Sequence, residues 1–181
     1  ALAGFMDPGV QSVTLPIFDK LKDERTRKVH KIQKSAKPTV ILFEGWCVGV
    51  PAQHHLALSV PASSFELSND NSGVWRSYVN ERLGADYVDV FNLLDRLSML
   101  KPPSFEVVCD WRVDQEIRSV ARRRRDSNDE SIRGMSLREV GDFVENFRRL
   151  TCHAIEVLPD LSDDTWELQA DRLVLKERLR S

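Results

Sequence analysis

The alternation of apolar and polar residues predicts several regular segments in the first part of the chain. Residues Thr39–Phe43 form a short apolar run, which is typical of a parallel strand covered on both faces. In Trp75–Leu83 and Asp86–Ser98 the apolar positions recur at helical spacing. Lys101-Pro102-Pro103 then interrupts the pattern.

The second part of the chain continues this alternation of strands and helices. Ser136, with Glu139 three residues later, is a capping box that begins a long helix running toward Val157 and ending at Pro159. The other expected elements are a strand at Phe105–Cys109, a basic helix at Asp114–Arg125, a strand at Trp166–Leu168 and an edge strand at Leu173–Leu175. Because strands separated by helices pair in parallel, we expect an α/β fold with a mainly parallel sheet.

Composition and charge narrow the function classes. The chain has 181 residues, of which 41% are hydrophobic and 30% charged. A formal net charge of −2 gives no general attraction to nucleic acid or to a membrane surface, and no apolar stretch approaches the roughly 20 residues of a membrane span. Three widely separated cysteines favour neither a disulfide framework nor a zinc site. We expect a cytoplasmic protein without nucleic-acid or membrane partners.

Glu44 is the first candidate for chemistry, since it follows the apolar run at Thr39–Phe43 directly and is itself followed by Gly45. An acid at the carboxyl end of a buried parallel strand points into the crevice where open α/β sheets bind ligands. In phosphoryl-transfer proteins such an acid manages magnesium or its water shell. The alternative is a solvated turn acid.

An arginine-rich stretch is the second candidate. It comprises Arg112, Arg118 and the run Arg122–Arg125. Arginines on a mobile segment stabilise the charge that develops in phosphoryl transfer when they close over the phosphates. A solvated helix face is the alternative. Nucleic-acid binding is a weaker one, because Asp126, Asp129 and Glu130 follow at once.

Motifs along nearly the whole chain resemble the D-glycerate 3-kinase family, a branch of the P-loop small-molecule kinases related to uridine kinase and phosphoribulokinase. The matching segments are Leu15–Lys20, Asp23–Arg25, Glu44–Gly49, Pro61–Glu66, Trp75–Asn80, Trp111–Glu116, Gly134–Ser136 and Arg149–His153. Pro61–Glu66 departs from the family pattern Pro-Ile-Asn-x-x-Glu by losing the asparagine. The resemblance implies a three-layer kinase-like sandwich that uses ATP and Mg²⁺ to phosphorylate a hydroxyl of D-glycerate or a similar small acid.

The resemblance also implies roles for single residues. Glu44 would order magnesium, directly or through water, and Asp19 would hold a substrate hydroxyl. Lys20 or Arg25 would pair with a substrate carboxylate. Arg118 and Arg122 would join the catalytic group within a lid at 112–134. The other residues expected at the substrate are Trp46, Arg76, Trp111, Arg112, Gln115 and Glu116. A nucleoside or a pantothenate-like substrate stays open.

One family feature is missing from these 181 residues. They contain no Gly-x-x-x-x-Gly-Lys followed by Ser or Thr, the loop that cradles the nucleotide phosphates. We therefore expect residues 1–181 to be a single partial kinase-like domain, inactive by itself and without the N-terminal strand and phosphate loop. Self-association through the incomplete sheet would follow from its open edges. The alternative is a non-catalytic kinase-like binding protein.

Overall fold

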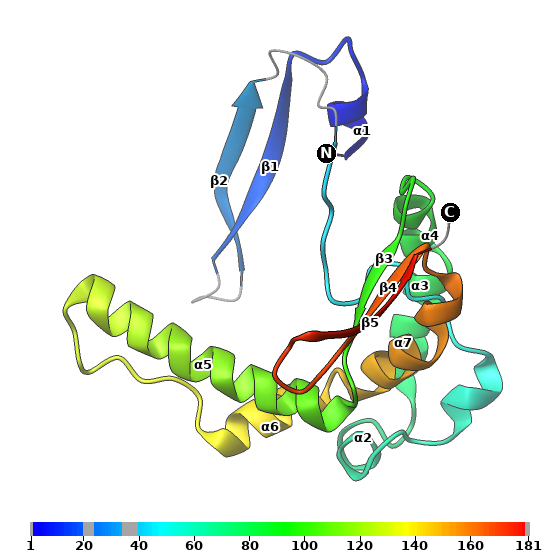
Figure 1. Cartoon of the computed structure of the whole chain (residues 1–181), viewed down its shortest axis with the longest axis vertical. Helices are drawn as coiled ribbons and strands as arrows, with labels where there is room; N and C mark the ends of the chain where they lie inside the picture. Colours follow the sequence, from blue (N-terminus) through cyan, green and yellow to red (C-terminus); the bar gives the residue numbers. More distant parts are fainter. Residues whose placement is uncertain (1, 20–23, 34–39, 180–181) are drawn as a thin grey trace. The chain divides into compact units, whose positions relative to one another are not determined.

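The computed structural model describes residues 2–19, 24–33 and 40–179 and divides the chain into two compact units (Figure 1). The first unit is Ala1–Glu44 and the second is Gly45–Ser181. A single domain over residues 1–181 stays a prediction.

The first unit is a hairpin with a short helix. Helix α1 is Leu2–Met6, and strands β1 (Ser12–Asp19) and β2 (Glu24–Gln33) pair antiparallel. The register shifts between Pro16 and Phe18, because proline cannot donate a hydrogen bond to the ladder. Val13 is buried in this unit and lies against Gly4 of α1.

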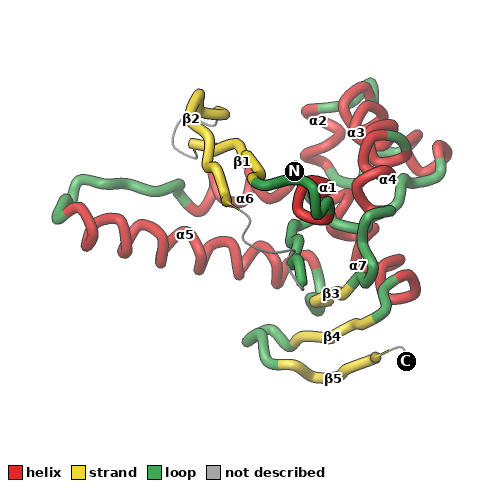
Figure 2. The backbone as a smooth tube through the Cα atoms, turned by 90° about the horizontal axis from the view of Figure 1, so that it is seen from above, coloured by secondary structure: helices red, strands yellow, loops and turns green. Residues whose placement is uncertain are grey.

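The second unit combines helices with a three-stranded sheet. Its elements are η1 (His55–Ser59), α2 (Ser64–Asn69), α3 (Val74–Gly84), α4 (Asp86–Phe91), β3 (Ser98–Lys101), α5 (Phe105–Ser127), α6 (Leu137–Glu145), α7 (Arg148–Leu161), β4 (Asp164–Leu168) and β5 (Val174–Leu179). The sheet order is β3–β4–β5, and Figure 2 shows these strands side by side. β3 pairs with β4 in parallel, and β4 pairs with β5 antiparallel.

Two apolar clusters hold the second unit together. In the first, Met99 of β3 meets Ala154 and Leu158 of α7 together with Val50, so α7 packs on one face of the sheet. Gly49 belongs to the segment that leads into this cluster. Its φ of 79° is left-handed, and a side chain there would meet Leu97, so the position requires glycine.

The second cluster joins α5 to α6. Phe105, from the first turn of α5, is buried against Val140 and Val144 of α6. Ser104 caps α5 by accepting a hydrogen bond from the N–H of Val107. This packing fixes the N-terminal half of α5, on which much of the candidate site lies.

The structure confirms several expected elements and corrects others. The helices at Trp75–Leu83 and Asp114–Arg125 form within α3 and α5. The capping box at Ser136 forms, and the strand at Trp166–Leu168 lies within β4. The edge strand begins at Val174 rather than at Leu173.

The prediction of a mainly parallel sheet is wrong. In the described part of the chain only β3 and β4 pair in parallel, and the fold is a mixed α/β arrangement of small sheets. The predicted strand at Thr39–Phe43 is not seen in its described part, where Val40 and Leu42 are exposed and 40–43 pairs with no described strand. A short apolar run has no strand structure without a partner to satisfy its backbone groups.

Three further boundaries differ from expectation. Phe105–Cys109 is the start of α5, not a strand, because Ser104 and the first-turn Glu106 favour a helix N-terminus. The helix expected over Asp86–Ser98 stops at Phe91, and Ser98 already belongs to β3.

The long helix expected from Ser136 to Val157 is split into α6 and α7, and α7 continues past Pro159 to Leu161. At the break, the side-chain amide of Asn146 donates to the carbonyl oxygens of Asp142 and Phe143. Such local side-chain bonds compete with the helical ladder.

Candidate functional site

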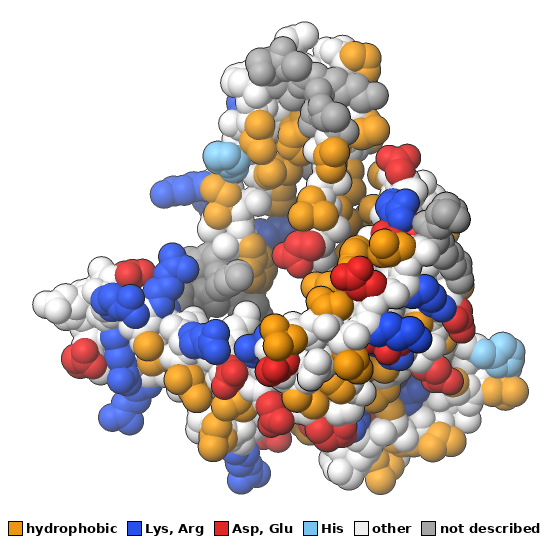
Figure 3. Space-filling view, viewed as in Figure 1, with side chains coloured by type: hydrophobic (Ala, Val, Ile, Leu, Met, Phe, Trp, Pro, Cys, Tyr) orange, Lys and Arg blue, Asp and Glu red, His pale blue; other side chains and the backbone are white. Residues whose placement is uncertain are grey.

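Helix α5 carries six of the twelve predicted site residues, and five of the six lie on one stripe. Its side chains at Val108, Trp111, Arg112, Gln115, Arg118, Ser119 and Arg122 line one open groove, together with Arg172 from the turn between β4 and β5. We call this the α5 groove. The spacing of three and four residues places them on the same face of the helix. Figure 3 shows basic side chains gathered over α5.

Two arginines of the α5 groove are only loosely paired. Arg118 lies 3.9 Å from Asp114 with its side chain 75% exposed, and Arg122 lies 3.4 Å from Asp126 with its side chain 81% exposed. Exposed pairs at this spacing contribute about 0.3–0.5 kcal/mol each. Either guanidinium can therefore turn toward an anionic ligand at little cost.

Arg112 is held much more firmly than its neighbours. Its Nη1 donates to Oε2 of Glu116 at 3.0 Å, and its guanidinium lies over the ring of Phe143, 5.3 Å from the ring centroid. The buried Glu116 also accepts a hydrogen bond from the backbone N–H of Met135 at 3.1 Å, and Arg123 lies 3.7 Å away.

Burial alone would raise the pKa of Glu116, but these donors and cations outweigh burial and hold the pKa below its ordinary value. The same carboxylate lies close to Gly134, where an added Cβ would meet its Oε1 at 2.6 Å and Val120 at 2.4 Å. Glu116 thus ties the segment before α6 to α5. Its carboxylate is engaged within the chain, rather than exposed to a ligand.

A series of aromatic contacts links Arg112 to Trp46. Trp46 was predicted to line the pocket, and in the sequence it follows shortly after the first unit. Phe143 lies 5.0 Å from Phe147, and Phe147 meets the ring of Trp46 edge-on at 4.7 Å. The indole Nε1 of Trp46 donates to Thr151 Oγ1 at 2.9 Å. Phe143 and Phe147 lie within the range of the helix expected from Ser136 toward Val157, but helical periodicity does not show which helix faces meet.

Trp111 contacts the turn between β4 and β5. Its Nε1 donates to the carbonyl oxygen of Ala170 at 2.7 Å, and Arg172 lies over its ring at 5.3 Å. Arg172 adopts a left-handed φ of 71° and lies 3.4 Å from Asp114. Arg172 was not predicted from the sequence, since it lies in a turn far from α5 along the chain.

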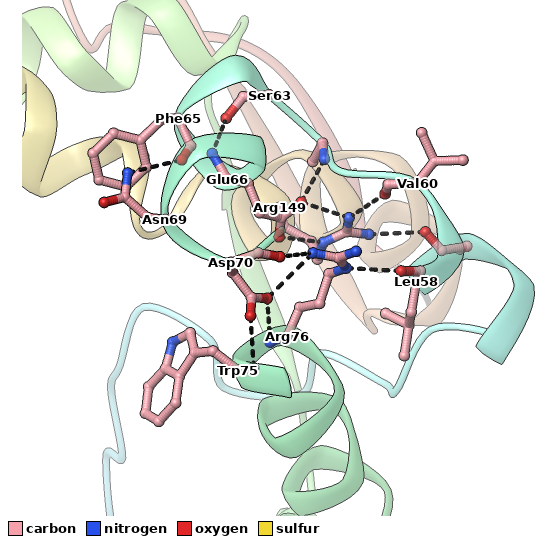
Figure 4. A network of polar contacts seen from close by, with 12 residues as sticks. Leu58, Val60, Ser63, Phe65, Glu66, Asn69, Asp70, Trp75, Arg76 and Arg149 are labelled. Carbon is pink, nitrogen blue, oxygen red and sulfur yellow. Dashed lines mark hydrogen bonds and ion pairs between the residues drawn. The ribbon is translucent and has the colours of Figure 1, made fainter. Parts of the chain in front are cut away.

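Arg76, also predicted at the substrate, lies in a different cluster (Figure 4). It is buried at the start of α3, where its Nε donates to the carbonyl oxygen of Leu58 at 2.7 Å. Its Nη1 contacts both the carbonyl oxygen and the carboxylate of Asp70. Asp70 also accepts the backbone N–H groups of Trp75 and Arg76.

Arg149 of α7 completes this cluster. Its guanidinium forms a bidentate pair with Glu66, with two contacts of 2.7 Å. It also donates to the carbonyl oxygens of Val60 at 2.6 Å and of Ala57 at 3.0 Å. We call Arg76, Asp70, Arg149 and Glu66 the arginine clamp. Both of its arginines have partners within the chain, and a substrate role for Arg76 stays a prediction.

Four predicted residues belong to the first unit. Asp19 is the last residue of β1 and lies opposite Glu24 in the register of the hairpin. Arg25 of β2 lies opposite Phe18 and is exposed. Glu44 is exposed at the end of the unit. Lys20 lies outside the described residues.

Two features, a cluster of metal-binding side chains and a membrane-spanning helix, are not found in the described residues. In the ranges 2–19, 24–33 and 40–179, no three His, Cys, Asp or Glu side chains are grouped so as to hold a metal ion. Over the same ranges, no helix has the length and apolar character required to cross a bilayer.

Comparisons with known proteins place this geometry in a wider context. No protein-family model matches the chain. Over 152 residues it is 32% identical to the uncharacterized kinase mug58 of Schizosaccharomyces pombe, an alignment that covers 81% of this chain and 50% of that protein. The chain thus spans about half the length of the curated relative it matches.

Among solved structures, the fold is similar to D-glycerate 3-kinase from Cryptococcus neoformans var. grubii. The TM-score is 0.65 with 18% sequence identity, over 93% of this chain and 59% of that one. The resemblance stated from the motifs is confirmed at the level of the fold. The chain is a kinase-like protein related in structure to D-glycerate 3-kinase.

Proposed function

We propose that this chain is part of an ATP-dependent phosphotransferase that phosphorylates a hydroxyl of D-glycerate or a similar small acid. The observation that carries the proposal is the α5 groove, which gathers five predicted site residues in a chain with the fold of a D-glycerate 3-kinase. These five residues are Trp111, Arg112, Gln115, Arg118 and Arg122.

The charges of the α5 groove fit the phosphates of MgATP. Arg118 and Arg122 are exposed and weakly paired, so their guanidinium groups are available to phosphate oxygens. Arg112, fixed by Glu116, supports them as a third positive charge. ATP supplies the transferred phosphoryl group. The arginines bind and orient it and offset the charge that grows on its oxygens.

Magnesium fits as a partner of the phosphates rather than as a resident metal. Mg²⁺ usually keeps several waters and takes one or two carboxylates plus phosphate oxygens, so a three-acid site is not required. Glu44 is exposed, and we assign it the role of ordering this ion or its waters.

For the acceptor, we assign roles to single residues that were predicted from the sequence. Glycerate carries one carboxylate and two hydroxyls, which call for a cation and hydrogen-bond partners. We assign Arg25 or Lys20 to the carboxylate and Asp19 to a hydroxyl. Trp46, packed on Phe147, supplies an apolar wall. A nucleoside or pantothenate-like acceptor would need other partners and is the competing substrate class.

A non-catalytic kinase-like binding protein is the second candidate, and one observation favours it. The 181 residues contain no phosphate loop. Phosphoryl transfer by a protein of this type needs that loop, so the enzyme hypothesis requires it from sequence outside these residues.

The test compares the 181-residue chain with the same chain extended by whatever coding sequence precedes Ala1. We expect no glycerate-dependent ADP release from the 181 residues, and release from the extended protein. In the extended protein, Glu44→Gln should lower turnover by about 10²–10³-fold, because it removes a charge beside magnesium. Circular dichroism melting should stay unchanged.

Glu156→Gln, on the exposed side of α7, is the matched control and should keep full turnover. An extended protein that binds ATP but transfers no phosphate to any small acid would support the binding-protein alternative. Normal turnover of Glu44→Gln would remove Glu44 from the site.

A further inference from the structure

Ser127 combines exposure with an unusual sequence environment. It is the last residue of α5, and its side chain is exposed. The run Arg122–Arg125 precedes it, separated from it only by Asp126. Such a dense run of positive charge directly before a hydroxyl is a recognition feature, and the phosphotransferase proposal uses only Arg122 of it.

The local structure makes this hydroxyl accessible. Asn128, with a left-handed φ of 51°, ends α5, and the chain continues as a polar loop. After Val120 and Ala121, no apolar residue follows until Ile132, so the last turn of the helix has no anchor in a core. Helix ends without buried contacts open easily. The hydroxyl of Ser127 makes one hydrogen bond, to the carbonyl oxygen of Arg123 at 2.7 Å, which is lost when that turn opens.

We propose that Ser127 is a phosphorylation site for a serine/threonine protein kinase with an acidic substrate groove. Arginines two to five residues before the acceptor complement such a groove in charge, and charge patterns of this kind determine protein-kinase specificity. The Ser127 oxygen attacks the γ-phosphorus of ATP held by that kinase. The new O–P bond forms as the bond to the β-phosphate bridging oxygen breaks. ADP leaves, and the hydroxyl proton passes to a carboxylate base of the modifying kinase.

Other serines near the same helix end are poorer acceptors. Ser131 directly follows Asp129 and Glu130, which an acidic groove repels. Ser136 has Arg133 three residues before it, but its hydroxyl donates to Glu139 at 2.7 Å in the capping box that begins α6. The geometry thus favours Ser127 over both neighbours.

Phosphorylation would change the charge of the basic helix end. A phosphoserine carries a charge of about −1.5 to −2 at pH 7. On the helix, Arg123 and Arg124 lie one turn before Ser127, within its reach. Arg124 now donates to the carbonyl oxygen of Ile132 at 2.9 Å, and Arg123 lies 3.7 Å from Glu116.

Drawing these two arginines to the phosphate would break the hydrogen bond from Arg124 to Ile132 and offset part of the positive field beside the α5 groove. A negative group at a helix C-terminus also opposes the helix dipole. This regulatory consequence rests on the proposed function, because it assumes that the α5 groove binds phosphates. The modification itself does not rest on it.

The experiment incubates the purified chain with ATP and the catalytic subunit of a cAMP-dependent protein kinase, then locates the phosphate by mass spectrometry. We expect near-stoichiometric phosphate on Ser127. Ser127→Ala should lower incorporation by at least about tenfold, and Arg124→Gln with Arg125→Gln should lower the initial rate by about tenfold, because the charge match is lost. Ser131→Ala is the matched control and should leave incorporation unchanged. A reaction without the added kinase excludes self-phosphorylation.

Phosphate found on Ser131 or Ser136 instead, or equal incorporation in Ser127→Ala, would overturn the proposed site. A second measurement compares tripolyphosphate binding by the modified and unmodified chain, where we expect at least threefold weaker binding after modification, by charge compensation. Equal binding would overturn the regulatory consequence. Because incorporation is read without any activity of the protein itself, failure of the phosphotransferase proposal leaves the result at Ser127 interpretable.

Discussion

The arginine clamp and the α5 groove use the same side chain in opposite ways. In the clamp, Arg149 meets Glu66 through two short contacts, with side-chain exposures of 11% and 15%. In the α5 groove, Arg118 and Arg122 keep single loose partners in the same helix and remain largely exposed. In the clamp, all three guanidinium nitrogens of Arg149 donate to partners within the chain, whereas the two α5 arginines are exposed to a ligand.

This difference separates stability from recognition. Removing one member of a buried ion pair leaves the other charge without compensation, whereas an exposed pair contributes almost nothing to stability. An arginine that binds a ligand needs N–H donors that its internal partners leave accessible. The clamp therefore joins η1, α2 and α7, which are distant in sequence. We expect ligand binding at the α5 groove instead.

Breaking the clamp should give the largest effect. We expect Arg149→Met to lower the free energy of unfolding by about 3–5 kcal/mol, because Glu66 and the carbonyl oxygens of Ala57 and Val60 lose their donor. Urea unfolding monitored by tryptophan fluorescence measures this. The matched control is Arg138→Met on α6, whose side chain is 92% exposed and should change stability by less than about 0.5 kcal/mol.

A loss at Arg149 no larger than the loss at Arg138 would contradict the distinction between the two regions. A double variant, Arg149→Met with Glu66→Gln, sharpens the comparison. It should recover part of the loss, since the uncompensated carboxylate is then also removed.

Acid should weaken the clamp. Burial raises the pKa of Glu66, but the hydrogen bonds and charge of Arg149 and the N–H of Ala62 bring it below its ordinary value. The pKa of Asp70 is also lowered, since the hydrogen bonds from Arg76 and Trp75 and the charge of Arg76 outweigh its desolvation. A carboxyl group with a lowered pKa in the folded state stabilises the fold fully above its unfolded pKa.

That contribution is lost as the pH falls through the lowered value, so thermal stability should decline below about pH 4, near the ordinary carboxyl pKa. Melting temperatures at pH 7, 5, 4 and 3 measure the decline. It should be shallower in Glu66→Gln and unchanged in Glu156→Gln. Equal pH dependence in all three proteins would show that the clamp carboxylates do not govern acid stability.

The sequence predicted the elements whose pattern is local. The helical spacing of Asp114–Arg125 and the capping box at Ser136 involve only near neighbours, and both appear as expected. Phe105–Cys109 was assigned to a strand because a short apolar run fits a strand and a helix start equally well. Packing against Val140 and Val144 decides in favour of the helix.

The candidate site divides along the same line. The stripe of α5 could be predicted because one helix carries it. Arg172 and the link from Phe143 through Phe147 to Trp46 depend on tertiary packing, which no local pattern contains. Arg76 was expected at the substrate from a motif alone. The structure pairs it with Asp70 and Leu58 instead, and partners of this kind cannot be read from charge spacing.

The smallest effect on stability should come from the α5 groove, and it should coincide with a loss of binding. We expect Arg118→Ala and Arg122→Ala each to change the free energy of unfolding by less than about 0.5 kcal/mol, because their pairs are exposed. Each should weaken binding of tripolyphosphate about three- to tenfold at low salt, and the difference should shrink at high salt as the charges are screened. Isothermal titration calorimetry at two salt concentrations measures both.

Arg118→Lys should lie between wild type and Arg118→Ala, since lysine keeps the charge but loses the planar fork that holds two phosphate oxygens. Arg138→Ala removes the same charge from a helix outside the groove. If it weakens binding as much as Arg118→Ala does, the ligand responds to net charge alone, and the α5 groove is a solvated helix face like any other.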